Sequence, residues 1–184
     1  MLMFNEVIDI YENFSQEFNG NYLEIGIYEA KLLCKLAEKH PNRQFYGIDP
    51  FIEDGFTEPI SKIQKGESLN SQRLIAYENL QKRPNATLFE MTTENFVKNH
   101  SDEIPNLNIS FVVIDGSHYF EDIVIDYNLA MNCLGHRPGI ILWDDFQITY
   151  VQQAFEKFQS DHKNRILKIE SINWRCKYSL IRAS

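Results

Sequence analysis

Acidic side chains recur where the apolar runs of the sequence end, and these are the residues best placed to do chemistry. They are Glu24, Asp49, Asp115 and the adjacent pair Asp144 and Asp145. If the apolar runs are parallel strands, the acids meet beyond the carboxyl edge of one sheet, which is where such sheets bind ligands. A rim of carboxylates favours a cationic ligand or a divalent metal ion over a phosphate group.

The turn after the first apolar run separates the possible cofactors. Residues 26–30 read Gly-Ile-Tyr-Glu-Ala, with one glycine and a carboxylate at the start of the next helix. A dinucleotide site needs small residues and free backbone N–H groups there, and the sequence contains no Gly-Lys-Ser/Thr phosphate loop. S-adenosylmethionine carries a sulfonium, an ammonium and ribose hydroxyls but no phosphate, so the acidic rim suits it. Asp49 can accept hydrogen bonds from both ribose hydroxyls.

The elements that must position these acids alternate between short apolar runs and helical patterns. Strands are predicted at residues 22–25, 44–48, 86–90, 109–114 and 140–143, and helices at 1–18, 29–40, 71–82, around 123–134 and around 151–158. Two further β-like runs, 165–171 and 176–182, are too close together for a helical crossover and should pair antiparallel. This alternation predicts an α/β fold with a mostly parallel sheet.

Composition and charge narrow the class of protein. The 184 residues include 26 acidic and 18 basic side chains, a net charge of −8, and 43% are hydrophobic, which fits one globular domain. This charge argues against a general nucleic-acid binder. No apolar run approaches the roughly 20 residues of a membrane span, and the N-terminal residues do not resemble a signal peptide, so we expect a cytoplasmic protein. Three cysteines, Cys34, Cys133 and Cys176, are expected to be buried free thiols.

Four segments resemble motifs of known enzymes. Residues 22–30 resemble the first motif, and residues 46–51 the second motif, of class I S-adenosylmethionine-dependent methyltransferases. Residues 111–119, with Asp-Gly-x-His, and residues 139–146, with Asp-Asp, are similar to the small-molecule O-methyltransferase branch that includes macrocin- and catechol-O-methyltransferase-like enzymes. The resemblance implies a Rossmann-like class I methyltransferase fold, with a seven-stranded, mostly parallel sheet, a C-terminal antiparallel hairpin and helices on both faces.

The resemblance also assigns roles to individual residues. It implies cofactor contacts from Glu24, Gly26, Tyr28, Asp49 and Asp115, and contacts to adenine from Thr92 and Thr93. In metal-dependent members, the positions of Asp115, Asp144 and Asp145 bind a divalent cation. That chemistry is sensible without the family, because three converging carboxylates repel each other unless a cation joins them, and oxygen ligands favour Mg²⁺, Mn²⁺ or Ca²⁺ over Zn²⁺.

Two positions depart from the family pattern. Ala30 stands where the family usually has glycine, and Ser117 stands where it often has an acid that can serve as the base. The second departure leaves His118 as the candidate catalytic base. It also leaves open that the metal alone activates the acceptor hydroxyl, or that catalysis is lost.

The leading hypothesis is O-methylation of a small hydroxylated molecule, assisted by Mg²⁺ or Mn²⁺, with residues 51–70 as a possible lid. A metal-dependent phosphoester hydrolase is one alternative, and the lack of Lys or Arg in the strand-end motifs counts against it. A catalytically silent cofactor-binding or scaffold protein is the other. A sugar hydroxyl, a phenol and a natural-product intermediate all remain possible acceptors, and the C-terminal hairpin could provide the edge of an oligomer.

Overall fold

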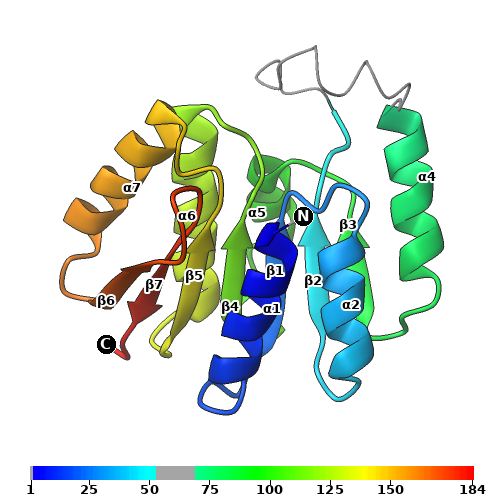
Figure 1. The fold of residues 1–184 in the computed structure, drawn as a ribbon, viewed down its shortest axis with the longest axis horizontal. Helices are drawn as coiled ribbons and strands as arrows, with labels where there is room; N and C mark the ends of the chain where they lie inside the picture. Colours follow the sequence, from blue (N-terminus) through cyan, green and yellow to red (C-terminus); the bar gives the residue numbers. More distant parts are fainter. Residues whose placement is uncertain (1, 53–68) are drawn as a thin grey trace.

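A seven-stranded sheet forms the centre of the molecule (Figure 1). The structure is a computed structural model that describes residues 2–52 and 69–184. The strands lie in the order β3-β2-β1-β4-β5-β7-β6, and they are β1 (Asn21–Ile25), β2 (Phe45–Ile48), β3 (Ala86–Phe89), β4 (Ile109–Ile114), β5 (Gly139–Trp143), β6 (Ile166–Ser171) and β7 (Lys177–Ile181). Strands β1 to β5 pair in parallel, and β7 pairs antiparallel with both β5 and β6. The predicted sheet and its C-terminal hairpin are confirmed.

Helices cover both faces of this sheet. They are α1 (Leu2–Phe14), α2 (Lys31–Lys39), α4 (Leu69–Leu80), α5 (Thr93–His100), α6 (Phe120–Leu134) and α7 (Thr149–Asp161), with a short 3-10 helix η1 (Ile104–Leu107). Helices α1, α2 and α4 contribute to one apolar core, and α5, η1, α6 and α7 contribute to the other. No helix is predicted from the sequence where α5 and η1 lie. The cause is their short length, because few buried apolar residues mark them, Phe96 alone in α5.

The central strands divide their side chains between the two cores with a period of two. In β4, Phe111 and Val113 pack with α1 and α2, whereas Val112 and Ile114 pack with α6 and α7. All six residues of β4 are buried, as expected for a parallel strand covered on both faces. The same burial explains why the run 109–114, apolar apart from Ser110, predicts the bounds of β4.

The connection from β1 to α2 lies where the sheet order reverses, since β1 pairs with β2 on one side and β4 on the other. Such a switch point opens a crevice beyond the strand ends. Gly26 has a φ of +84°, and a Cβ on it would lie 2.1 Å from the Asp115 carbonyl oxygen. Tyr28 and Ala30 also have positive φ, 52° and 56°, so α2 begins at Lys31 rather than at the predicted residue 29.

Other expectations have mixed outcomes. The three cysteines are buried free thiols, as predicted. The N-terminal helix ends at Phe14 rather than at residue 18. Residues 53–68, most of the predicted lid segment 51–70, lie outside the described residues. Among the described residues, no helix is both long and apolar enough to cross a membrane.

Candidate functional site

Asp49 holds the first loop against the end of β2. Its Oδ2 accepts hydrogen bonds from the backbone N–H groups of Ile27, at 2.9 Å, and Tyr28, at 3.0 Å. Its Oδ1 accepts from the N–H of Phe51 at 2.7 Å. The carboxylate therefore lies at the predicted place, but it already receives backbone donors. A contact from Asp49 to ribose stays a prediction.

Glu24 is a buried acid in β1, beside the same loop. Tyr22 donates its hydroxyl hydrogen bond to Glu24 Oε2 at 3.1 Å. Burial raises the pKa of Glu24 to about 8, with the hydrogen bond from Tyr22 opposing the change and the charge of Asp49 adding to it. Burial thus favours the neutral form of the side chain, and a cationic ligand group beside it would favour its ionised form.

Asp115, Asp144 and Asp145 converge at the ends of β4 and β5. Each offers a carboxylate oxygen, and these atoms all lie within 4.8 Å of one another. Strand pairing causes this, because Ile114 pairs with Trp143 and so aligns the two strand ends. The convergence that the sequence predicts is confirmed. Metal binding by the cluster stays a prediction.

Asp144 is the buried member of the cluster, and the half-buried Asp115 lies beside it. Burial raises the pKa of Asp115 well above its usual value, and the charges of Asp144 and Asp145 add to the effect. Burial and the charge of Asp145 also raise the pKa of Asp144. The two carboxyl groups share a hydrogen bond. Asp144, only 5% exposed, leaves Oδ1 without a hydrogen-bond partner among the described residues. A buried, unpartnered carboxylate oxygen beside two other acids is the feature that a cation would satisfy.

Asp145 differs because the chain supplies its partners. Its Oδ2 lies 2.9 Å from His118 Nε2. Its Oδ1 accepts from Gln147 Nε2 at 2.7 Å and from Arg175 Nη2 at 2.5 Å. Burial opposes ionisation, but the hydrogen bonds from His118, Gln147 and Arg175 hold the pKa of Asp145 below its usual range. Asp145 is therefore the ionised member of the cluster.

Arg175 is a site residue that sequence reasoning missed. It lies in the loop between β6 and β7, thirty residues beyond Asp145 in the chain. The antiparallel pairing of β7 with β5 aligns Lys177 with Trp143 and so returns this loop to the acidic cluster. The strand-end motifs lack Lys and Arg, but the loop between β6 and β7 brings a cation to the site. The predicted hairpin was the available signal, because its loop had to lie at the end of β5.

Ser117 and His118 occupy the loop between β4 and α6. Ser117 Oγ donates to Asp122 Oδ2 at 2.7 Å and accepts from the N–H of Tyr119 at 3.3 Å. The position where the resemblance expects an acid thus helps to begin α6. His118 lies against the acidic cluster through Asp145, and its catalytic role stays a prediction.

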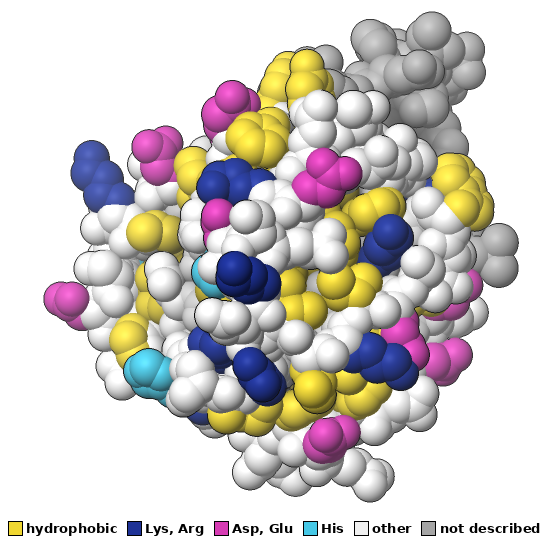
Figure 2. All heavy atoms as spheres, turned by 90° about the vertical axis from the view of Figure 1, so that its left-hand side faces the viewer, with side chains coloured by type: hydrophobic (Ala, Val, Ile, Leu, Met, Phe, Trp, Pro, Cys, Tyr) yellow, Lys and Arg dark blue, Asp and Glu magenta, His cyan; other side chains and the backbone are white. Residues whose placement is uncertain are grey.

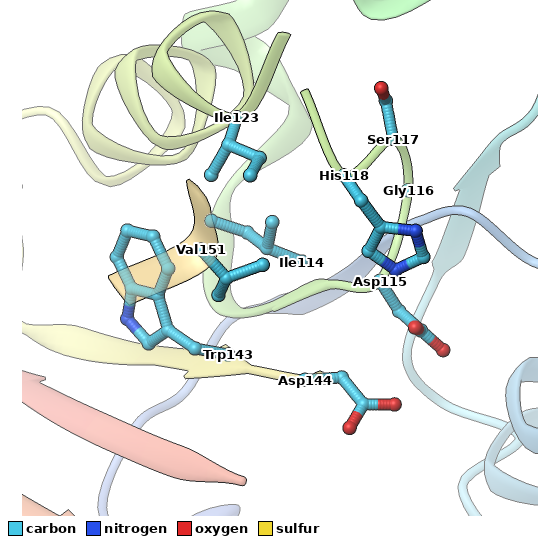
Figure 3. A pocket seen from close by; sticks show the side chains of 9 residues that line it. All are labelled: Ile114, Asp115, Gly116, Ser117, His118, Ile123, Trp143, Asp144 and Val151. Atoms are coloured by element: carbon cyan, nitrogen blue, oxygen red, sulfur yellow. The ribbon is translucent and has the colours of Figure 1, made fainter. Parts of the chain in front are cut away.

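A small cavity separates the acids from an apolar wall (Figure 3). Ile123, Trp143 and Val151 form that wall, and the carboxyl groups of Asp115 and Asp144 point away from it (Figure 3). The cavity has a volume of about 10 Å³, which is room for about one water molecule. An acceptor molecule would therefore have to approach the acids from the outer side.

Thr92 and Thr93 lie at the start of α5, beyond the end of β3. Thr92 Oγ1 caps that helix by accepting from the N–H of Asn95 at 3.2 Å. Thr93 hydrogen-bonds to Asp126, a buried acid of α6. Both hydroxyls therefore have structural partners, and their predicted contact with adenine is not tested by the geometry.

Comparison by sequence assigns no established family to this chain. No family model matches the sequence. One curated relative, the uncharacterized protein R132 of Acanthamoeba polyphaga mimivirus, is 25% identical over 146 residues, which cover 75% of this chain and 58% of that protein. The chain thus spans little more than half the length of this relative.

Solved structures give closer matches in shape than in sequence. The O-methyltransferase NovP aligns with a TM-score of 0.65 at 11% identity, over 99% of this chain and 80% of its own. CalS11, a TDP-rhamnose 3'-O-methyltransferase of calicheamicin biosynthesis, aligns at 0.63 and 15%, over 97% and 79%. MycE, a methyltransferase solved with Mg and S-adenosylhomocysteine, aligns at 0.58 and 12%, over 98% and 47%.

The chain therefore has the fold of the class I S-adenosylmethionine-dependent O-methyltransferases. At these identities the likeness defines the fold, and the activity has to be argued from the residues of the site.

Proposed function

We propose that this chain is an S-adenosylmethionine-dependent methyltransferase that methylates a hydroxyl group of a small molecule with the help of a divalent cation. One observation carries the proposal. The carboxylates of Asp115, Asp144 and Asp145 converge beside the loop of Gly26, where the sheet order reverses. This arrangement supports adjacent sites for a cofactor and for an oxygen-bound metal ion.

The first loop fits the cofactor in size and charge. Gly26 has no Cβ, so the loop packs directly against the Asp115 backbone, which brings the first loop next to the acidic cluster. Glu24 presents a buried carboxyl group that can pair with an ammonium or sulfonium group. Tyr28, Asp49, Thr92, Thr93 and Asp115 complete the proposed set of cofactor contacts.

The acidic cluster fits Mg²⁺ or Mn²⁺. All three donors are carboxylates, the ligands that these hard cations prefer. Asp144 Oδ1 has no other partner among the described residues. When bound, the cation would lower the pKa of an acceptor hydroxyl, and the cofactor would supply the methyl group.

His118 is the proposed proton acceptor. Because Asp145 is ionised, His118 Nε2 donates to it, and the lone pair of the neutral imidazole then lies on Nδ1. Asp145 thereby fixes the orientation of the ring. The bound cofactor would supply the methyl group to the acceptor oxygen, and His118 would take the proton of the acceptor hydroxyl.

Large exposed side chains follow several strand ends and would meet the acceptor. They are Tyr28, Ile52, Tyr119, Tyr150 and Trp174. Their position favours an acceptor with an apolar or aromatic face, such as a phenol or a hydroxylated natural-product intermediate.

We further propose that the whole chain acts as one domain in the cytoplasm, where thiols such as the buried Cys34 stay reduced.

The catalytically silent alternative also has an observation in its favour. Ser117 replaces the acid of the family pattern, and its hydroxyl is engaged with Asp122. The hydrolase alternative gains Arg175 as a cation beside the acids. Methyl transfer separates the proposed function from both alternatives, and phosphoester hydrolysis separates the alternatives from each other.

The test is transfer of a radiolabelled methyl group from S-adenosylmethionine to a panel of phenols, sugars and hydroxylated aromatic acids, with Mg²⁺ or with EDTA. We expect transfer that EDTA and the double change Asp144→Ala/Asp145→Ala abolish, and that His118→Ala lowers by about 10² to 10⁴. Asp9→Asn, an exposed acid of α1, is the matched control and should leave transfer unchanged. Equal transfer with and without EDTA would contradict the role of the metal. Phosphoester hydrolysis without any methyl transfer would favour the hydrolase.

A further inference from the structure

The loop between β6 and β7 is held firmly in its backbone. Asn173 Oδ1 accepts from the N–H groups of Arg175, at 2.7 Å, and Cys176, at 2.9 Å. Asn173 Nδ2 donates to Glu6 of α1 at 2.6 Å. The N–H of Phe146 donates to the carbonyl oxygen of Arg175 at 2.7 Å. Any movement at Arg175 is therefore confined to its side chain, which is 44% exposed and has solvent to move into.

The Arg175 side chain takes the place that a metal ion would need at Asp145. Its Nη2 lies 2.5 Å from Asp145 Oδ1, which also accepts from Gln147, while His118 contacts Oδ2. A divalent cation ligated by Asp145 would stand close to this guanidinium, and two positive groups at such a distance repel each other. By contrast, Asp144 Oδ1 has no hydrogen-bond partner among the described residues.

The acidic cluster is therefore divided between a half that already has a counter-cation and a half that lacks one. We propose that Arg175 and a divalent cation compete for Asp145, so that Arg175 is a positioning residue that sets the metal affinity of the site and leaves Asp145 when the metal binds. This inference rests on the proposed metal site. It assigns the regulation of metal affinity to a residue outside the strand-end motifs.

Trp174 provides a direct report of the exchange. Its side chain is 75% exposed, and the Arg175 guanidinium carbon lies 5.9 Å from the centre of its ring. The chain has one other tryptophan, Trp143, which is fully buried. When the guanidinium leaves Asp145, the surroundings of Trp174 change, and Trp174→Phe separates this signal from that of Trp143, which directly precedes Asp144.

A general effect of charge has to be separated from a specific exchange. Lys and Arg side chains gather on the side of the molecule formed by α7, β6 and β7 (Figure 2), so removal of any one of them could strengthen cation binding. Lys177, at the start of β7, is the matched control because its ammonium lies 3.8 Å from the centre of the Phe146 ring rather than on Asp145.

The experiment measures Mn²⁺ binding by the electron paramagnetic resonance signal of free Mn²⁺, without cofactor or acceptor. Couplings between binding events commonly change affinity about 5- to 150-fold, so we expect Arg175→Gln to bind Mn²⁺ at least about fivefold more tightly than the wild-type protein. Lys177→Gln should differ from wild type by less than about twofold. Asp145→Asn should weaken binding and remove the advantage of Arg175→Gln in the double variant.

The second readout is tryptophan fluorescence during titration with Mg²⁺. We expect an emission change in the wild-type protein that is lost in Trp174→Phe and in Arg175→Gln. Equal Mn²⁺ affinity in the wild type and Arg175→Gln would overturn the proposal, as would an equal gain in Lys177→Gln or an absence of Mn²⁺ binding in every variant. S-adenosylmethionine binding, measured on the same samples, separates a failure of this inference from a failure of the proposed function. Intact cofactor binding with unchanged Mn²⁺ affinities defeats this inference alone.

Discussion

Asp126 is a buried acid whose ionisation opposes folding, so its replacement by asparagine should change how stability depends on pH. It lies on α6 and is 2% exposed. It bonds to Thr93 at the start of α5, and its Oδ2 lies 3.4 Å from where a Cβ on Gly116 would stand. Burial raises the pKa of Asp126 from 3.8 to about 7, with Thr93 opposing the change and Asp122 adding to it.

The sign and size of the effect follow from this pKa. A carboxyl group with a raised pKa in the folded state favours folding while it is protonated, so its contribution is present below pH 3.8 and is lost as the pH rises through about 7. Between pH 5 and pH 7 the unfolded chain is ionised here and the folded chain is not. Each pH unit then lowers the free energy of unfolding by about 1.4 kcal/mol, or by about 3 kcal/mol over the interval.

Asparagine at position 126 keeps the shape and can bond to Thr93 without ionising. We expect the free energy of unfolding of Asp126→Asn, relative to wild type, to rise by about 3 kcal/mol between pH 5 and pH 8. Urea unfolding at both pH values, followed by far-ultraviolet circular dichroism, measures this difference, and Asp9→Asn should show none. A difference between Asp126→Asn and wild type that is the same at pH 5 and pH 8 would refute the reasoning.

Two further substitutions test the first loop. Gly26→Ala should abolish cofactor binding in calorimetry and destabilise the fold by more than about 1 kcal/mol, because its Cβ would lie 2.1 Å from the Asp115 carbonyl oxygen at a φ of +84°; wild-type affinity would contradict this. Ala30→Gly should raise the free energy of unfolding by about 0.5 to 1 kcal/mol, because Ala30 has a φ of 56°. Urea unfolding measures it, and a loss of stability would show that packing of the Ala30 methyl group outweighs the backbone strain.

Much of the fold could be predicted from the sequence because its strands are buried on both faces. The run 109–114 is apolar apart from Ser110, and its bounds agree with β4. The convergence of Asp115 with Asp144 followed from parallel pairing, since parallel strands end at one edge of the sheet. Helix α5 was missed because it is short and buries Phe96 alone.

The rest of the site depends on contacts that sequence spacing does not encode. Arg175 reaches Asp145 because β7 pairs antiparallel with β5, so no local motif contains both residues. Asp126 interrupts the apolar face of α6 and looks like a solvent-facing residue in the sequence, yet it is buried against Thr93. Ser117 reads as a lost base, and in the structure it helps to begin α6 through Asp122.

Calorimetric titration with S-adenosylmethionine and S-adenosylhomocysteine, with Mg²⁺ and then with EDTA, tests the central claim most directly. We expect both nucleosides to bind with dissociation constants on the order of 1 to 100 μM, about −8 to −5 kcal/mol, and Glu24→Ala to weaken both while Asp9→Asn leaves them unchanged. A failure of the wild-type protein to bind either nucleoside, with or without Mg²⁺, would contradict the account.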